Sequence, residues 1–226
     1  PDLFANYYRE QFELLLRMSN EQGESVSPEK FLSAAERYQL APAIDRWVVR
    51  RTIEMLTPHA ARLQEIQAGF AVNISGQSLG DADFAVFMDT VLRDSKLPRG
   101  LLSFEVTETA AVANIVRAEA LIRRLRDLGS DVALDDFGRG LSSFANLKHL
   151  SLDYLKIDGS FIRNLASDNV NQAMVTAMVK LARSLNFKVI AEQVEDLSAL
   201  DSARRMGVDF VQGYQVGRPA PLQLAS

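Results

Sequence analysis

The chain has 226 residues, of which 47% are hydrophobic and 24% charged, a balance typical of a folded domain with a sizeable core. Its net charge of −4 and pI of about 5.3 argue against non-specific binding to DNA or a membrane surface, which needs a basic face. The lack of cysteine and the presence of only two histidines argue against thiolate chemistry, histidine-rich zinc sites and Ser-His-Asp triads. A bound metal would therefore be held mainly by oxygen atoms, which favours magnesium, manganese or calcium.

The N-terminal quarter predicts two strands and two helices. A short strand is expected at residues 3–8 and a second at 12–17, whose alternation places Glu13, Leu15 and Arg17 on one face. After a polar turn at 20–23, Ser27 and a proline predict the start of a helix. A further helix is expected over 42–56, with Trp47 among its candidate core residues.

From residue 69 onward, strands and helices alternate. Strands are predicted at 69–75, 101–108, 132–137, 154–158, 187–192 and 208–213, and helices at 81–95, 114–128, 141–150, 170–185 and 197–206. Apolar strands separated by helices indicate a parallel sheet covered by helices. Eight strands in 226 residues favour an α/β fold of the TIM-like (β/α)8 barrel type. An open doubly wound sheet is the alternative, but no glycine-rich phosphate loop follows the first strand.

Nothing in the sequence divides the chain, so a single domain is expected over residues 1–226. No linker or low-complexity stretch is present, and no apolar run reaches the roughly 18 residues of a membrane span. No signal peptide is recognisable, which predicts a cytoplasmic domain, although a longer protein containing it could be anchored in a membrane. The absence of an initiating Met suggests a fragment of such a longer protein.

The stretch 132–140 is the most unusual of the chain. Its apolar run ends in two adjacent carboxylates, Asp135 and Asp136, and then breaks into a glycine-bounded loop. Neighbouring carboxylates repel each other, so a divalent metal between them is one explanation. A solvated turn is the other, since Asp and Gly are common turn residues.

Polar residues end most of the other predicted strands as well. In a parallel barrel the C-terminal strand ends meet at one face, where active sites lie. Each acid alone could be a helix cap or a surface residue, but their convergence favours an oxygen-rich site for two hard cations, with Asp135 between them. The residues concerned are Asn73, Glu105, Glu108, Asp135, Asp136, Lys156, Asp158, Glu192 and Gln212, with Glu13 inside the second strand.

Two cations about 3.5–4 Å apart can polarise a phosphate and lower the pKa of a shared water. Lys156 could orient that water, and Arg17 could bind a phosphate oxygen. These residues together predict hydrolysis of a phosphodiester.

The order of these motifs resembles the EAL domain family, bacterial phosphodiesterases that linearise cyclic di-GMP to pGpG. The matches are Glu-Leu-Leu at 13–15 for the family's Glu-Ala-Leu, Asn-x-Ser at 73–75, Glu-x-Thr-Glu at 105–108, Asp-Asp-Phe-Gly-x-Gly at 135–140, Leu-Lys-Ile-Asp at 155–158, Ala-Glu-x-Val-Glu at 191–195 and Gln-Gly-Tyr at 212–214. The resemblance covers nearly the whole chain and implies a TIM-like barrel whose first strand is antiparallel to its neighbour.

The resemblance also implies residue roles. It assigns the metal ligands Glu13, Asn73, Glu105, Asp135 and Asp136, the catalytic residues Lys156, Glu192 and Glu108, and the substrate contacts Arg17, Leu15, Asp158, Gln212 and Glu195. Lys156 and Glu192 would position and activate the water, with Glu192 and Gln212 also near the second metal. Glu108 would anchor the loop after Asp136. Two Mg²⁺ or Mn²⁺ ions are the implied cofactors, and Ca²⁺ is expected to inhibit.

Four departures from the family pattern stand out. Leu14, Arg139 and Gln193 replace the more usual Ala, Thr or Ser, and Gly. The fourth is that no Gln-Pro precedes the Glu13 strand, and Tyr8 meets Arg9 with little room for a turn, although an antiparallel pair needs a connection of at least two residues. We therefore expect residues to be missing there, so that the two Cα atoms would lie further apart than the normal 3.8 Å or so.

Three functions fit the sequence to different degrees. An active cyclic di-GMP phosphodiesterase is favoured because every metal-ligand position is retained. A cyclic di-GMP receptor without turnover, signalling through its loop and dimer interface, is the alternative, and an unrelated barrel metalloenzyme is the third. The implied partners are cyclic di-GMP, a second copy of the chain and an upstream GGDEF or sensor domain, but no nucleic-acid polymer.

Overall fold

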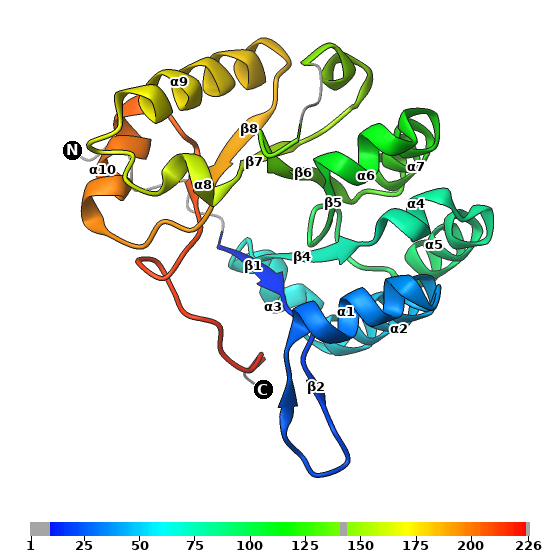
Figure 1. The fold of residues 1–226 in the computed structure, drawn as a ribbon. Coiled ribbons are helices and arrows are strands. Elements are labelled where there is room, and N and C mark those ends of the chain that lie inside the picture. Colours follow the sequence, from blue (N-terminus) through cyan, green and yellow to red (C-terminus); the bar gives the residue numbers. More distant parts are fainter. Residues whose placement is uncertain (1–9, 141–143, 225–226) are drawn as a thin grey trace. The chain divides into compact units, whose positions relative to one another are not determined.

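The computed structural model describes residues 10–140 and 144–224 (Figure 1). The predicted strand at 3–8, its antiparallel orientation and the expected break between Tyr8 and Arg9 lie outside these residues. The first three residues of the helix predicted at 141–150 also lie outside them.

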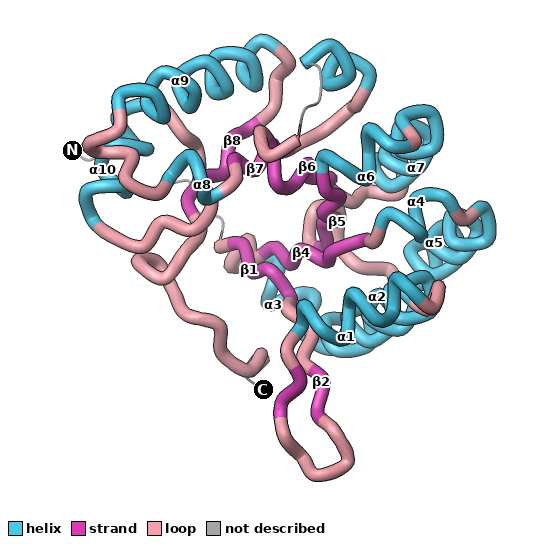
Figure 2. Tube along the Cα trace, viewed as in Figure 1, coloured by secondary structure: helices cyan, strands magenta, loops and turns pink. Residues whose placement is uncertain are grey.

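A parallel sheet is the centre of the fold. Over the described residues, seven strands follow the order β1 (Gln11–Leu14), β4 (Gly69–Ile74), β5 (Leu102–Thr107), β6 (Asp131–Phe137), β7 (Tyr154–Ile157), β8 (Lys188–Ala191) and β9 (Phe210–Val211). The pairs β1–β4, β6–β7, β7–β8 and β8–β9 are parallel. The predicted α/β class with a parallel sheet is thus confirmed. A separate hairpin of β2 (Met18–Ser19) and β3 (Ser25–Val26) encloses the predicted polar turn (Figure 2).

Six described helices match predicted ones to within a few residues: α1 (Pro28–Arg37), α2 (Ala41–Leu56), α5 (Ala82–Ser95), α7 (Ile115–Asp127), α9 (Asn169–Ser184) and α10 (Leu197–Met206). Four short helices were not predicted: α3 (Ala60–Glu65), α4 (Gly76–Gly80), α6 (Glu108–Ala113) and α8 (Gly159–Ile162). The described part of the helix predicted at 141–150 is instead the 3₁₀ helix η2 (Phe144–His149), and a second one, η1 (Thr57–His59), follows α2.

Side-chain caps explain where several helices begin. Asp81, Asp168 and Asp196 each accept a hydrogen bond from a backbone N–H in the first turn of α5, α9 and α10. Such caps satisfy donors that have no partner within the helix. Ser27 precedes α1 as predicted, but its side chain makes no capping hydrogen bond, so Pro28 is the stronger start signal there.

The chain divides into two compact units, and the boundary runs through β5 and α7. The first unit comprises residues 1–104, 124–130 and 224–226, and the second residues 105–123 and 131–223. The prediction of a single domain stays a prediction. No helix among the described residues is long and apolar enough to cross a membrane.

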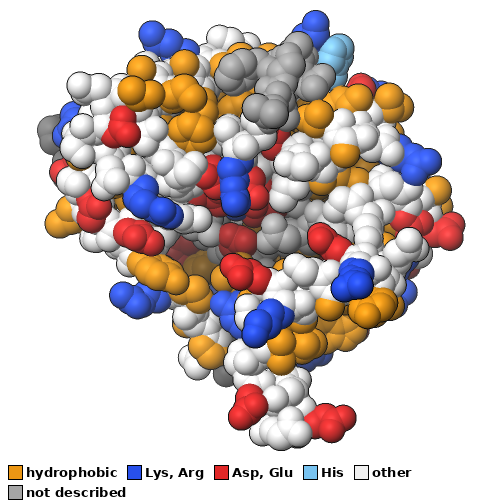
Figure 3. Space-filling view, viewed as in Figure 1, with side chains coloured by type: hydrophobic (Ala, Val, Ile, Leu, Met, Phe, Trp, Pro, Cys, Tyr) orange, Lys and Arg blue, Asp and Glu red, His pale blue; other side chains and the backbone are white. Residues whose placement is uncertain are grey.

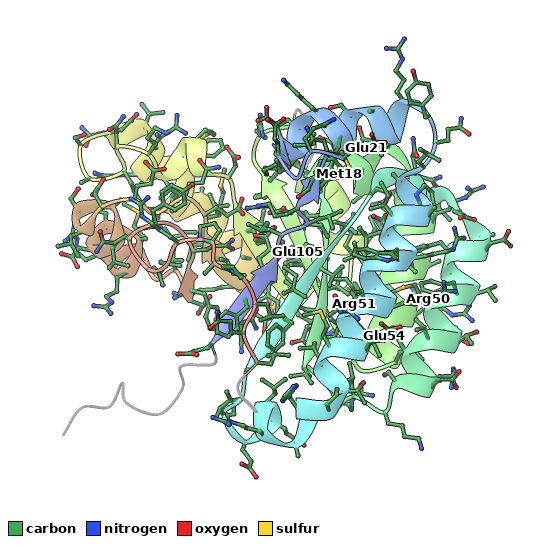
Figure 4. The ribbon with its side chains drawn as sticks, turned by 90° about the horizontal axis from the view of Figure 1, so that it is seen from below. Met18, Glu21, Arg50, Arg51, Glu54 and Glu105 are labelled. Carbon is green, nitrogen blue, oxygen red and sulfur yellow. The ribbon has the colours of Figure 1, made fainter. Side chains whose placement is uncertain are left out.

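In the first unit, α2 packs against α1, α4, α5 and β4. Val49, Ile53 and Leu56 are buried on one side of α2, whereas Arg50, Arg51 and Glu54 lie on another (Figure 4). Trp47, predicted in this core, is 57% exposed, so that prediction is wrong. The helical register that buries Asp45, Val49 and Thr52 turns Trp47 toward solvent.

In the second unit, β6 to β9 run side by side and α9 packs against β7 and β8. Ala133, Tyr154 and Ile190 form a buried apolar cluster with the partly buried Phe210, whose ring meets that of Tyr154 edge-on at 6.0 Å. Each of these residues lies on a different strand, so the cluster is one layer of side chains across the sheet.

Candidate functional site

Four charged or polar residues of the second unit come two positions after the members of this apolar cluster in the sequence. Side chains two residues apart on a strand share a face. Asp135 and Lys156 therefore follow Ala133 and Tyr154 on β6 and β7, toward the C-terminal strand ends, and Glu192 and Gln212 come directly after β8 and β9, two residues beyond Ile190 and Phe210. The apolar layer thus forms a floor beneath a layer of charged and polar side chains.

Lys156 is the centre of that polar layer. Its Nζ atom lies 2.6 Å from Glu105 Oε2, 3.0 Å from Asp135 Oδ1 and 3.0 Å from Glu192 Oε1. Lys156 is 0% exposed and Glu105, which lies among the strands (Figure 4), is 4% exposed. Water cannot screen these charges well, so the ammonium holds three carboxylates together at the ends of three strands.

A β-bulge explains how both adjacent aspartates reach this site. In the β6–β7 pairing, Leu134 faces Leu155 and Phe137 faces Ile157, so Asp135 and Asp136 together oppose the single residue Lys156. Asp136 has a φ of 57°, a left-handed conformation that Asp tolerates better than most residues. In a regular strand these two side chains would point to opposite faces, and the bulge removes that constraint.

Asp136 also belongs to a second group of acids. Ligand atoms of Asp136, Asp158 and Glu192 all lie within 4.8 Å of one another, a spacing that could hold a metal ion. Burial, followed by the charge of Asp135, raises the pKa of Asp136, whereas the nearby Arg139 guanidinium acts in the other direction. Burial also acts to raise the pKa of Asp158, but hydrogen bonds from Ser160 outweigh it and hold that pKa below its usual value.

The donor set fits a hard divalent cation. Asp135 Oδ1 is buried and accepts no hydrogen bond from the described residues, although Lys156 Nζ lies 3.0 Å away. That contact is an ion pair without the direction of a hydrogen bond, which leaves lone-pair capacity on a buried oxygen. Such an atom among several carboxylate oxygens is the kind of ligand that Mg²⁺ and Mn²⁺ prefer.

Glu108 fixes the loop that follows the bulge. Its Oε2 atom accepts hydrogen bonds from the backbone N–H groups of Gly138 at 3.0 Å and Gly140 at 3.4 Å. Gly138 has a φ of 97°, and a Cβ atom there would come within 2.7 Å of the Phe161 ring. These two hydrogen bonds are the contacts expected of a residue that anchors the loop after Asp136.

Glu13 and Asn73 meet each other within the first unit. They lie on the paired strands β1 and β4, and Asn73 Nδ2 donates a hydrogen bond of 2.8 Å to Glu13 Oε1. Strand β1 ends at Leu14, so Leu15 and Arg17 lie beyond it, and Arg17 donates to the carbonyl of its neighbour Leu16. The alternation predicted for 12–17 thus holds only as far as Leu14.

Of the remaining predicted residues, Gln212 is partly buried after β9 and Glu195 is exposed. The backbone of Gln212 pairs with Ala191 and Val194. The next residue, Gly213, has a φ of 150°, and a Cβ atom there would lie 2.3 Å from the backbone of Val194. Glycine therefore lets the chain after Gln212 pass close to the segment after Glu192.

The structure brings together six of the predicted residues in the second unit: Glu105, Asp135, Asp136, Lys156, Asp158 and Glu192. Acidic side chains gather beside α8 and the ends of β7 and β8 in the space-filling view (Figure 3). Sequence reasoning treated Arg139 only as a loop substitution, although its Nη1 atom lies 3.7 Å from Asp136 Oδ1. The sequence does place Arg139 three residues after Asp136, and this spacing could have indicated an ion pair between them.

The family model described as "EAL domain" matches residues 6–219. Among sequence relatives, the cyclic di-GMP phosphodiesterase PdeF of Escherichia coli K12 is 38% identical over 210 residues, or 93% of this chain and 28% of the relative. PdeB of Shewanella oneidensis, with the same description, is 36% identical over 97% of this chain and 26% of its own length. The chain thus spans about a quarter of the length of these relatives.

Solved structures agree with the sequence relatives. The FimX EAL domain from Pseudomonas aeruginosa bound to c-di-GMP matches with a TM-score of 0.85 and 32% identity over 94% of this chain and 84% of that one. The PaMucR phosphodiesterase in complex with c-di-GMP matches with a TM-score of 0.84 and 33% identity over 92% and 84% of the two chains. These matches confirm the predicted barrel-type α/β fold, and the chain belongs to the EAL domain family.

Proposed function

We propose that this domain hydrolyses cyclic di-GMP to linear pGpG. The observation that carries the proposal is the cluster in which Lys156 touches Glu105, Asp135 and Glu192, in a chain 38% identical to a named cyclic di-GMP phosphodiesterase. In the reaction a water oxygen bonds to phosphorus and the bond to a ribose 3′-oxygen breaks. One proton of the water ends on that oxygen, so ring opening consumes one water and needs no other reactant.

The residues around Lys156 suit this chemistry. Lys156 cannot move far, because three carboxylates surround its Nζ atom, so its positive charge is fixed beside Asp135 and Glu192, where it can orient a water. Glu192 Oε1 lies 3.0 Å from the same nitrogen and can accept a proton from a water held there. Lys156 also offsets part of the negative charge that would otherwise repel a phosphodiester.

The domain is proposed to use two Mg²⁺ or Mn²⁺ ions. Glu13, Asn73, Glu105 and Asp135 would hold one ion, and Asp135 and Asp136 the other, with Glu192 and Gln212 nearby. The spacing of Asp136, Asp158 and Glu192 and the buried Oδ1 of Asp135 support a cation in this cluster. Bound divalent ions would polarise the phosphate and lower the pKa of a coordinated water. Leu15, Arg17, Asp158, Gln212 and Glu195 are proposed to contact substrate.

A receptor that binds cyclic di-GMP without turnover is the second candidate. It is favoured by one observation, the ion pair that joins Arg139 to Asp136 at the acidic cluster.

For either function we further propose that the chain forms a homodimer and follows a GGDEF or sensor domain in a longer protein. We also propose that Ca²⁺ inhibits it and that it acts in the cytoplasm.

Turnover of cyclic di-GMP by the purified protein tests these functions. We expect pGpG to form with Mg²⁺ or Mn²⁺ and not in EDTA. Asp135→Asn should lose at least about 100-fold in kcat, because one coordinating oxygen is replaced by an amide. Asp201→Asn, on the exposed side of α10, is the matched control and should retain activity. Binding without product would favour the receptor, and neither binding nor product would contradict both proposals.

A further inference from the structure

The acidic cluster carries more negative than positive charge. Within the described residues, five carboxylates meet around one ammonium: Glu105, Asp135 and Glu192 contact Lys156, and Asp136 and Asp158 approach Glu192. A substrate with phosphate groups would be repelled by this cluster unless further positive charge were present. Cations can supply that charge, and so can any arginine within reach.

Arg139 is placed to do so. Its Nη1 atom lies 3.7 Å from Asp136 Oδ1, and its positive charge acts on both Asp136 and Asp158. Its backbone N–H bonds to the carbonyl of Asp136 at 3.3 Å. Glu108 anchors the N–H groups of Gly138 and Gly140, the residues on either side of Arg139. The backbone of Arg139 is therefore held, whereas its side chain is 67% exposed and able to turn.

We propose that Arg139 is a substrate-binding residue that changes partners. Its guanidinium pairs with Asp136 in the structure, and it binds a phosphate of the cyclic dinucleotide once cations neutralise that carboxylate. The flat guanidinium group matches two phosphate oxygens in a way that the Thr or Ser more usual at this position could not. The inference rests on the proposed function, because it names a further contact for the same substrate.

This exchange predicts two effects of opposite sign for Arg139→Ser. Cation binding should tighten about two- to fivefold, since an exposed ion pair that competes for Asp136 is removed. Binding of cyclic di-GMP should weaken roughly tenfold, since a charge-assisted contact to phosphate is lost. Arg139→Lys keeps the charge and should leave cation binding near wild type, while nucleotide binding recovers only in part. A merely structural role would shift both constants in the same direction or neither.

Two titrations of the purified protein test the proposal. Calorimetry with Mn²⁺ alone gives the cation affinity, and titration of cyclic di-GMP in Ca²⁺, where turnover is expected to be blocked, gives the nucleotide affinity. Arg204→Ser removes an exposed arginine from α10 and should change neither constant. The inference is overturned if Arg139→Ser leaves the Mn²⁺ affinity unchanged, or if it does not weaken nucleotide binding. If both shifts are seen but wild type yields no pGpG with Mn²⁺, only the hydrolysis proposal fails.

Discussion

Lys156 is the residue on which the acidic cluster depends most. Three carboxylates lie within 3.0 Å of its buried Nζ atom, and they would repel one another without it. We expect Lys156→Met to lower the free energy of unfolding by about 3–5 kcal/mol in EDTA, the usual cost of removing one partner from a buried ion pair. Urea unfolding followed by circular dichroism measures this loss.

Divalent cations should reverse part of the Lys156→Met loss, because they replace the missing positive charge. Stability should therefore recover in Mn²⁺ by more in the variant than in wild type. Lys180→Met, at an exposed position on α9, is the control and should change stability by less than about 0.5 kcal/mol. An equal loss for the two substitutions would show that the cluster does not rely on Lys156.

Residue identities at the site were predictable from the sequence, but their joint geometry was not. Glu105, Lys156 and Glu192 were predicted near the C-terminal ends of their strands, because each follows a run of apolar residues. Alternation along a strand would send Asp135 and Asp136 to opposite faces, and the bulge that prevents this depends on the pairing of β6 with β7. Pairing partners distant in sequence leave no local signal, so the left-handed Asp136 could not be foreseen.

Asp45 connects α2 to the segment after β4, because it lies on α2 and accepts hydrogen bonds from Ser75, the N-cap of α4, and from Ser78 within α4. Its Oδ2 atom accepts from Ser75 N at 2.9 Å and from Ser78 Oγ at 2.7 Å. Burial raises the pKa of Asp45 above its ordinary value of 3.8, although these hydrogen bonds act to lower it. The native state therefore holds this proton more tightly than the unfolded state does.

This shift predicts the pH dependence of Asp45→Asn. Below pH 3.8 both states are protonated at Asp45, and between 3.8 and the raised native pKa the native state binds more protons. In the wild type, the contribution of Asp45 to the free energy of unfolding therefore falls as the pH rises through that window and is constant above it. Asparagine keeps an acceptor oxygen and has no proton to lose, so the stability of Asp45→Asn relative to wild type should rise across the window. Urea unfolding at a series of pH values measures the difference, and parallel curves would contradict it.

At the scale of elements, the hydrophobic periodicity of the sequence and the residues typical of helix ends predicted most of the helices and strands. Helices α5, α9 and α10 begin within one residue of their predicted starts, and in the structure an aspartate caps each of them. The helix predicted at 141–150 is, where described, the 3₁₀ helix η2, and Trp47 is exposed instead of buried. The error at Trp47 arises because apolarity says nothing of which face of a helix a neighbouring element covers.

For the molecule as a whole, cation binding links local chemistry to global stability. We propose that Glu13 and Asn73 bind the same cation as Glu105 and Asp135. A ligand that binds only the native state stabilises it by about 2.7 kcal/mol at 100 times its Kd. For a chain of 226 residues this corresponds to a rise in Tm of roughly 5–10 °C in Mn²⁺ over EDTA.

Glu13→Gln and Asp135→Asn then test the shared assignment, since they alter strands β1 and β6. Each substitution alone should abolish most of the rise in Tm, and the double variant should lose little more than either single one, because residues that bind one ion are not additive. Differential scanning calorimetry of wild type, both single variants and the double variant, each in Mn²⁺ and in EDTA, gives the required cycle. Independent, additive losses would instead mean that Glu13 and Asp135 bind different ions, and the assignment of Glu13 and Asn73 to a shared cation would then be withdrawn.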